Sequence, residues 1–310
     1  LKDVSQVGEM EGIKRRAFAQ LQSGVFLVIE KGWRDDVVLR LTQSPPATRP
    51  EFRGAGRIIT GRHGYFPGFG VEVSDHELPD AVRESDPTGG WVKLIGDWPQ
   101  KGKGPVINFS EEALSDACRV AHEAGLRVAI HAMAPDTPSM AVRAGCDSIE
   151  HGLYLTIDDL QLLGQRQGAW VPTICNTEDV MSGFLAGSTA ARVLGTGLDN
   201  LRQLLPMAAD LGVGVMAGTD LGLAHGEVAL EAIRLRDFGL SGREAVNAVG
   251  PNAYSYLGLP ALTVGATADL LLFETNPIDD VNTLTQPLLG IRAGEVVFDR
   301  RGLLERSGAV

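Results

Sequence analysis

The stretch HEAGLRVAIHA, residues 122–132, contains the end of a helix, a glycine and a short β-rich apolar run. Gly125 lies where the helix should stop, because glycine tolerates the left-handed conformation that ends many helices. The same phrase returns as VRAGCDSIEHG at 142–152 and as ADLGVGVMAGTD at 209–220. Helices that alternate with strands in this way are typical of βαβ units, so the sequence predicts a parallel sheet.

Working outward from these stretches, we predict seven strands of this kind. They are Val25–Glu30, Arg57–Thr60, Trp91–Ile95, Arg127–Ala132, Ser148–Gly152, Trp170–Ile174 and Gly212–Ala217. Helix start signals stand between several of them. Ser110 precedes two acidic residues, and the pairs Thr156 with Asp159 and Ser241 with Glu244 have the spacing of a capping box.

A closed barrel of this class needs eight strands, whereas seven would leave two unpaired edges facing each other. The helical segment Gly8–Leu21 precedes the first visible strand and should itself follow a strand. The chain also begins with Leu1 rather than Met. We therefore expect an α/β fold, a (β/α)₈ TIM-like barrel whose first strand lies upstream of Leu1.

The sequence texture changes after Pro260. Ala268–Phe273 and Gly290–Phe298 are predicted as two strands, the second with an Arg-Ala-Gly-Glu turn, and no helical period separates them. The predicted domains are a barrel over residues 1–259, holding strands two to eight, and a small β appendage over residues 260–310.

Composition limits the classes of partner. The chain has 28 Lys and Arg against 39 Asp and Glu, a net charge of −11, which argues against nucleic acid or an anionic membrane. No apolar run approaches the roughly 20 residues of a membrane span. The three cysteines fit free thiols in a reducing compartment. We expect a cytoplasmic protein that acts on a small molecule, with homo-oligomerisation left open.

Four side chains stand at or near the ends of predicted barrel strands four, five, six and eight. They are Lys93 in WVKLIGDW, His131 in VAIHA, His151 in SIEHG and Asp220 in VMAGTD. Barrel enzymes place catalytic groups at the C-terminal ends of strands. Two imidazoles and a carboxylate suit a divalent cation such as zinc, whereas Lys93 can join them only as an anion, for example after carbamylation by CO₂.

The order Lys, His, His, Asp in WVKLIGDW, VAIHA, SIEHGLYL and AGTD resembles the amidohydrolase superfamily, in its imidazolonepropionase-like and prolidase-like branch. The tail GLPALTVGATADLLLFETNPIDDV, residues 258–281, is similar to the family's return to a β-sandwich. The resemblance runs from about Gly8 to Val297, and its motifs say little about substrate.

The resemblance implies that His131, His151 and Asp220 bind one or two Zn²⁺ ions, two if carboxylated Lys93 bridges them. It also implies a His-x-His pair on the first strand, which none of the six histidines here can form. We expect that pair upstream of Leu1.

Other candidates lie at the same predicted mouth. His63, in GRHGYFPG, resembles a substrate-contacting histidine of this branch, although a solvated loop residue fits as well. Tyr65 and Trp98 are predicted substrate contacts by position. His225 is a further substrate candidate, although its position favours a role in organising its loop and starting the next helix.

The predicted function is hydrolysis of an amide-type C–N bond in a dipeptide, N-acyl amino acid or cyclic amide. A metal-activated hydroxide attacks the carbonyl, Asp220 acts as general base and then acid, and His151 assists. Three alternatives stay open at this point: a metal-independent lyase with Lys93 as Schiff base, a non-catalytic binding barrel, and a metal site acting on another electrophile such as a lactone or phosphotriester.

Overall fold

The computed structural model describes residues 10–100 and 103–306. Its centre is a parallel sheet of seven strands. In spatial order they are β11 (Gly214–Val215), β10 (Ala169–Val171), β9 (Ser148–His151), β8 (Arg127–Ala132), β5 (Trp91–Ile95), β3 (Ile58–Gly61) and β4 (Val71–Val73). Consecutive parallel neighbours joined through helices are the arrangement that the sequence predicts.

A second pair of parallel strands adjoins this sheet. β1 (Leu27–Glu30) pairs with β2 (Glu51–Gly54), and β2 leads into β3 through residues 55–57. Beyond β1, Trp33 forms a parallel bridge with Arg57. Each of the seven predicted barrel strands is therefore present, and β2 and β4 were not predicted.

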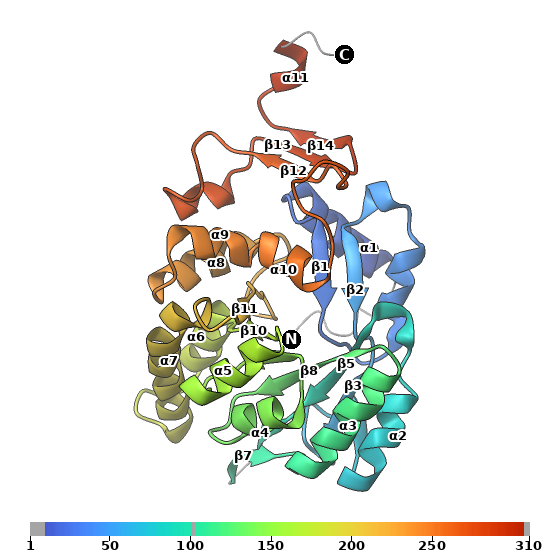
Figure 1. The fold of residues 1–310 in the computed structure, drawn as a ribbon, viewed down its shortest axis with the longest axis vertical. Coiled ribbons are helices and arrows are strands. Elements are labelled where there is room, and N and C mark those ends of the chain that lie inside the picture. Colours follow the sequence, from blue (N-terminus) through green and yellow to red (C-terminus); the bar gives the residue numbers. More distant parts are fainter. Residues whose placement is uncertain (1–9, 101–102, 307–310) are drawn as a thin grey trace.

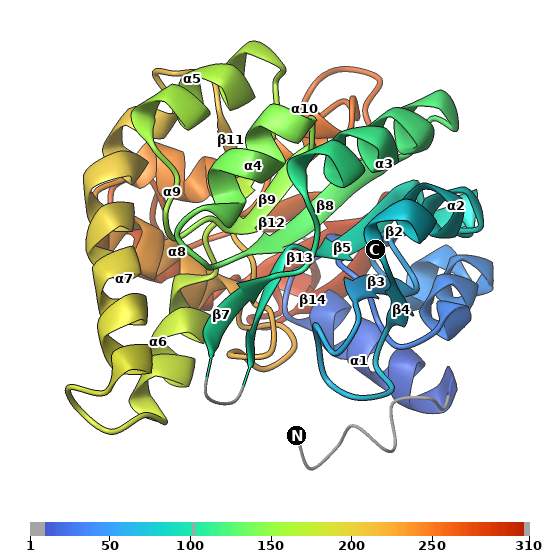
Figure 2. The ribbon, with the colours of Figure 1, turned by 90° about the horizontal axis from the view of Figure 1, so that it is seen from below.

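Helices cover the outside of the sheet, and Figures 1 and 2 show α3, α4 and α5 side by side across it. Ser110 caps α3 by accepting from Ala113 N, and the predicted capping boxes at Thr156 and Ser241 are both formed. The helices are α1 (Met10–Gln22), α2 (Leu78–Arg83), α3 (Glu111–Glu123), α4 (Thr137–Ala144), α5 (Ile157–Gln165), α6 (Ile174–Ser182), α7 (Thr189–Ala208), α8 (Val228–Asp237), α9 (Gly242–Ala248), α10 (Pro251–Tyr256) and α11 (Leu303–Arg306).

The main apolar core lies between the sheet and these helices. Leu114 and Ala117 of α3 pack toward Val128 and Ile130 of β8, and all four side chains are fully buried or nearly so. Burial on this scale fixes each strand's position, so the strand ends are rigid supports for polar side chains.

Two local predictions need correction. The strand predicted at Trp170–Ile174 ends at Val171, because Pro172 has no N–H to donate and Thr173 takes a left-handed conformation with φ of 49°. Ile174 already belongs to α6. In addition, β6 (Asp97–Gln100) and β7 (Gly104–Ile107) form an antiparallel pair that was not predicted.

The C-terminal part forms a separate antiparallel sheet, drawn beyond β1 and β2 in Figure 1. Its strands are β12 (Leu270–Leu272), β13 (Leu289–Arg292) and β14 (Glu295–Asp299). The run predicted as one strand is thus a hairpin, because Ala293 and Gly294 both have positive φ at its turn. The predicted boundary after residue 259 falls between α10 and β12 and stays a prediction.

In the described part of the chain, no helix has both the length and the apolar character needed to cross a membrane.

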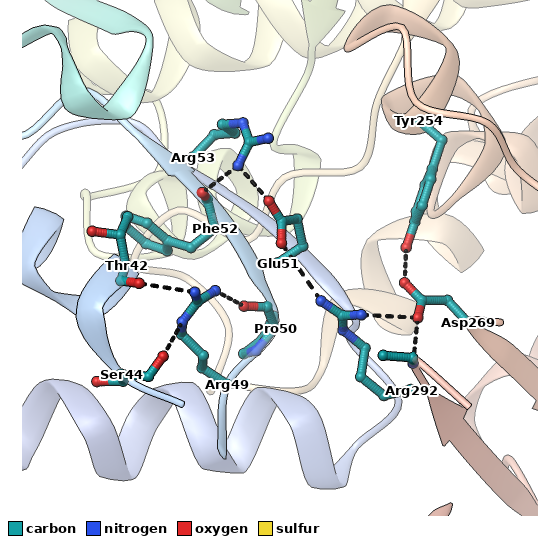
Figure 3. Close-up of polar contacts among 11 residues, drawn as sticks. Thr42, Ser44, Arg49, Pro50, Glu51, Phe52, Arg53, Tyr254, Asp269 and Arg292 are labelled. Carbon is teal, nitrogen blue, oxygen red and sulfur yellow. Dashed lines mark hydrogen bonds and ion pairs between the residues drawn. The ribbon is translucent and has the colours of Figure 1, made fainter. Parts of the chain in front are cut away.

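An ionic network joins the small sheet to the barrel, as Figure 3 shows. Arg292 on β13 donates to Asp269 at 3.0 Å and lies 3.6 Å from Glu51 at the start of β2. Asp269 also accepts from Tyr254 of α10 at 2.9 Å. Because the side chains of Arg292 and Asp269 are only 7% and 9% exposed, loss of one partner leaves a poorly solvated charge.

We expect Arg292→Ala to lower the free energy of unfolding by about 3 kcal/mol, because it leaves Asp269 and Glu51 without their shared cation. Urea unfolding followed by circular dichroism measures the change. Arg301→Ala is the matched control, since Arg301 pairs with Glu274 at the surface and is 52% exposed. The control should cost less than about 1 kcal/mol, and equal losses in both variants would contradict the assigned role.

Candidate active site

The structure brings the four predicted ligand residues to one region inside the strand ends. The His131 and His151 rings lie 4.6 Å apart between centroids, and His151 Nε2 is 3.9 Å from Asp220 Oδ2. Lys93 is close enough to influence both imidazoles electrostatically, and Asp220 influences Lys93 in turn. Lys93, His131 and His151 are buried, whereas the Asp220 side chain is 36% exposed.

Strand register explains why these side chains meet. Ile95 of β5 pairs with His131 of β8, and Ala132 of β8 pairs with His151 of β9. Lys93 lies two residues before Ile95, so it shares the face of the sheet on which His131 stands. The parallel pairing of β5, β8 and β9 thus sets where Lys93, His131 and His151 lie along their strands relative to one another.

Positive backbone φ angles gather at this end of the sheet. Among the described residues other than glycine, only seven have positive φ, and they include His63 (57°), His151 (66°), Thr173 (49°) and Asp220 (43°). Such conformations are strained, most of all for β-branched threonine, and they are enriched at functional sites. At His151 the left-handed conformation has a structural consequence. Glu150 and His151 are neighbours on one strand, yet both lie near enough to Lys93 to be influenced by its charge.

The Thr173 hydroxyl lies between two partners, Pro172 O at 2.8 Å and His151 Nδ1 at 2.5 Å. When the hydroxyl donates to the carbonyl, its oxygen accepts from the N–H at Nδ1, and the Nε2 lone pair is directed toward Asp220. A histidine that is held in this way is ready to bind a metal ion.

The segment after β10 also orients Asp220. Asn176 Nδ2 donates to Asp220 Oδ2 at 2.9 Å. Just before Asn176, at the start of α6, the backbone N–H groups of Ile174 and Cys175 donate to the buried carboxylate of Glu231, at 2.6 and 2.9 Å. Glu231 of α8 thus holds the turn that supplies Thr173 and Asn176.

Burial governs the charges at the centre. It lowers the pKa of Lys93 against the opposing effect of the Glu150 carboxylate. Burial, with the neighbouring His151 and Lys93, also lowers the pKa of His131 well below its usual value, so this imidazole is neutral near pH 7. Burial lowers the pKa of His151 as well, and Asp220 opposes that shift.

A partly buried ion pair lies near this group. Lys31, which follows β1, donates to Glu150 at 3.0 Å and to Ser148 at 3.1 Å, and its amine lies 3.7 Å from the centre of the Trp91 ring. Burial raises the pKa of nearby Glu30 to about 7. Gly32 is needed at this place, because a Cβ there would lie 2.9 Å from Lys93 Cγ.

The predicted substrate contacts differ in where they lie. The Trp98 ring is 5.6 Å from His131 and 4.6 Å from Tyr65 between centroids, so Trp98 and Tyr65 stand beside the site. The His63 side chain is 92% exposed and faces Glu72, 3.9 Å away. His225 is close to Arg16, which with burial lowers the His225 pKa. Across residues 10–100 and 103–306, neither histidine forms a hydrogen bond or an ion pair with Lys93, His131, His151 or Asp220.

Four contributors were missed by sequence reasoning: Asp97, Thr173, Asn176 and Glu231. Asp97 lies 3.7 Å from His131 Nε2 and accepts from Met133 N and Ala134 N. Asp97 follows Lys93 by four residues, which is a usable signal because it lies two residues after the end of β5. Nothing in the sequence marks the other three, because their partners lie 22 to 57 residues away.

The donor set fits a divalent cation in type, with two neutral imidazoles and a carboxylate. Among residues 10–100 and 103–306, however, no three His, Cys, Asp or Glu side chains are close enough to form a ready-made metal site. A cation here therefore needs a further ligand, such as a carbamylated Lys93, or a small closure of the side chains.

Comparison with known proteins agrees with this architecture. The Amidohydrolase family description matches residues 99–297. An uncharacterized protein of Mycobacterium bovis is 35% identical over 278 residues, covering 83% of this chain and 74% of that protein. The chain belongs to the amidohydrolase family and is thus a hydrolase of carbon–nitrogen bonds.

More distant relatives share the fold. The structure of a Xaa-Pro dipeptidase with bound methionine superposes with a TM-score of 0.76 at 23% identity, covering 93% of this chain and 80% of that one. Ochratoxinase of Aspergillus niger superposes with a TM-score of 0.77 at 20% identity, covering 94% and 76%. In sequence, this chain matches about half of ochratoxinase, 52% of its length.

We expect Glu231→Gln to change how stability depends on pH. Burial raises the Glu231 pKa from 4.5 to about 7, so between these values the folded protein keeps a proton that the unfolded chain has lost. The wild-type free energy of unfolding should fall as pH rises through that window, by up to about 3 kcal/mol from this group. The glutamine variant should lack this contribution.

Urea unfolding of both proteins at pH 4.5, 6 and 8 measures the difference. Glu112→Gln is the control, because Glu112 is exposed in the first turn of α3. It should leave the wild-type pH profile unchanged. If wild type and Glu231→Gln give parallel profiles, Glu231 is not the titrating group.

Proposed function

We propose that this protein is a metal-dependent hydrolase that cleaves an amide-type bond in a small molecule such as a dipeptide, an N-acyl amino acid or a cyclic amide. One observation supports the proposal most strongly. Two neutral imidazoles, a buried amine and a partly exposed carboxylate, carried by or following four strands of the sheet, face a common region. The similarity to a Xaa-Pro dipeptidase and to ochratoxinase favours an amide substrate.

In this proposal His131, His151, Asp220 and carbamylated Lys93 hold one or two divalent cations, with zinc as the first candidate. Burial prepares these residues, because it keeps the imidazoles neutral and favours the free amine of Lys93. The free amine attacks CO₂, forms the carbamate and releases one proton. When bound, the cation supplies an acidified water as nucleophile and polarises the substrate carbonyl.

Asp220 is the proton carrier in this mechanism. Asn176 donates to Oδ2 of its carboxylate, which fixes the carboxylate's orientation, and its partial exposure leaves it reachable by water and substrate. Asp220 accepts the proton of the attacking water and delivers it to the leaving nitrogen as the C–N bond breaks. His151 faces the same atoms through Nε2 and assists in orienting them.

We expect Asp220→Asn to lower kcat by 10²-fold or more, because an amide cannot accept the proton of the nucleophilic water. Steady-state kinetics with a panel of dipeptides and N-acetyl amino acids measures the loss. His122→Gln is the control, since His122 lies on the outside of α3 and pairs with Asp147. Normal turnover in Asp220→Asn would eliminate Asp220 as the proton carrier.

We also expect metal analysis to find divalent cation in the intact protein, and His131→Ala to bind less of it than the His122→Gln control. Chelation should abolish hydrolysis, and added Zn²⁺ should restore it. Elemental analysis and activity after dialysis measure both effects. A metal-free but active protein whose Lys93 is trapped by borohydride would support the Schiff-base alternative instead.

A further inference from the structure

Five aromatic side chains pack against one another beside the candidate active site. Tyr65, Phe66 and Phe69 come from the segment between β3 and β4, Trp98 from β6, and Trp33 from the turn after β1. We call this group the aromatic cluster. Its members are brought together by three separate parts of the chain, so no single loop explains it.

The rings meet mostly edge to face. Trp98 lies 4.6 Å from Tyr65 and 4.8 Å from Phe66 between centroids, with interplanar angles of 66° and 67°. Trp33 meets Phe69 at 4.9 Å and 88°. This geometry is favourable for aromatic pairs and holds each ring in a defined orientation, so the cluster is an ordered surface.

The cluster is neither core nor ordinary surface. All five side chains are half-buried, which leaves part of each ring in contact with solvent. Contiguous apolar surface of this kind is unfavourable in water, and it marks binding sites in soluble proteins. Aromatic residues in a satisfied core, such as Trp91 and Trp170 in this chain, are fully buried.

The cluster is continuous with the catalytic centre at two points. The Trp98 ring is 5.6 Å from the His131 ring, and Tyr65 is near enough to Asp220 for that carboxylate to help raise its pKa, after burial. Tyr65 also makes no hydrogen bond through its hydroxyl within the described part of the chain, so this donor is available to a bound molecule. A group that rests on the cluster therefore lies next to the bond that the centre would cleave.

We propose that the aromatic cluster is the subsite for an aromatic or bulky apolar group of the substrate, directly flanking the scissile C–N bond. The assignment rests on the proposed hydrolase function and specifies its substrate class. A small or strongly polar group would leave the rings exposed, whereas an apolar group removes water from them.

A cationic group fits the cluster less well, although aromatic rings also bind cations. Edge-to-face packing places the edge of one ring over the face of the next, so few faces are free to receive a cation. The proposed metal ion would add positive charge nearby. An uncharged apolar group avoids both difficulties.

Matched substrates test the subsite on the intact protein loaded with Zn²⁺. N-acetyl-L-alanine is the reference, N-acetyl-L-phenylalanine places a ring on the amine side, and N-benzoyl-L-alanine places one on the acyl side. We expect at least one aromatic compound to exceed the reference in kcat/KM by about tenfold or more. Equal values, or a preference for N-acetyl-trimethyllysine, would overturn the assignment.

Substitutions within the aromatic cluster test whether the cluster is the source of the preference for an aromatic substrate. Trp98→Ala should reduce the ratio of kcat/KM between the preferred aromatic compound and the reference by about tenfold, and Phe66→Ala serves the same purpose if Trp98→Ala does not fold. Phe18→Ala is the control, because Phe18 lies on α1 and is 49% exposed outside the cluster. A preference that persists in both cluster variants would place the apolar subsite elsewhere.

Binding separates this inference from the proposed function. If the protein hydrolyses none of the amides, the proposed function fails. Calorimetric titration with N-benzoyl-L-alanine and N-acetyl-L-alanine then decides the subsite alone. Tighter binding of the benzoyl compound to wild type, and not to the cluster variants, supports the subsite. Equal binding of the two compounds overturns it.

Discussion

Ionisable groups buried at the centre of the sheet must compensate one another, and the arrangement of the site follows from that constraint. An isolated charge in such an interior costs several kcal/mol, so lysines and carboxylates persist there only in mutual contact or in neutral form. Burial lowers the pKa of both Lys31 and Lys93, and the Glu150 carboxylate opposes the shift in each case. The two lysines differ in contact: Lys31 pairs directly with Glu150 at 3.0 Å, whereas Lys93 lies beside the imidazoles, where the proposed carbamate would form.

The same constraint explains why the backbone is strained where it is. Regular alternation would turn His151 away from the interior once Glu150 faces inward. The left-handed conformation at His151 places both side chains on the Lys93 side, and the left-handed Thr173 brings its hydroxyl to His151 Nδ1. The strain is sustained by contacts made elsewhere, above all by Glu231, which accepts two backbone N–H groups from the turn after Thr173.

The parts of this architecture that the sequence predicts are the local ones. Glycine stops, capping boxes and short apolar runs locate the seven barrel strands, because each depends on residues a few positions apart. The strand ends also identify Lys93, His131, His151 and Asp220 as neighbours, since parallel strands bring their carboxyl ends to one edge. Glu231 and Asn176 carry no such signal, because Glu231 meets the N–H groups of Ile174 and Cys175, and Asn176 meets Asp220, only once the chain has folded. The turn of the β13–β14 hairpin was located in the sequence as Arg-Ala-Gly-Glu, but the run around it was predicted as one strand and not as two.

The proposed catalytic residues and the aromatic cluster proposed to bind substrate are attached to the fold in different ways. His131, His151 and Lys93 stand on strands whose positions are fixed by the buried core, so their geometry tolerates little change. Tyr65, Phe66 and Phe69 belong to the connection between β3 and β4, and Trp98 belongs to β6 of the β6–β7 hairpin, where β7 extends beyond the sheet in Figure 2. Connections of this kind change more freely than the strands they join. If the aromatic cluster is the substrate subsite, changes in these two segments and in the turn that carries Trp33 would alter substrate preference and leave the strands that hold His131, His151 and Lys93 in place.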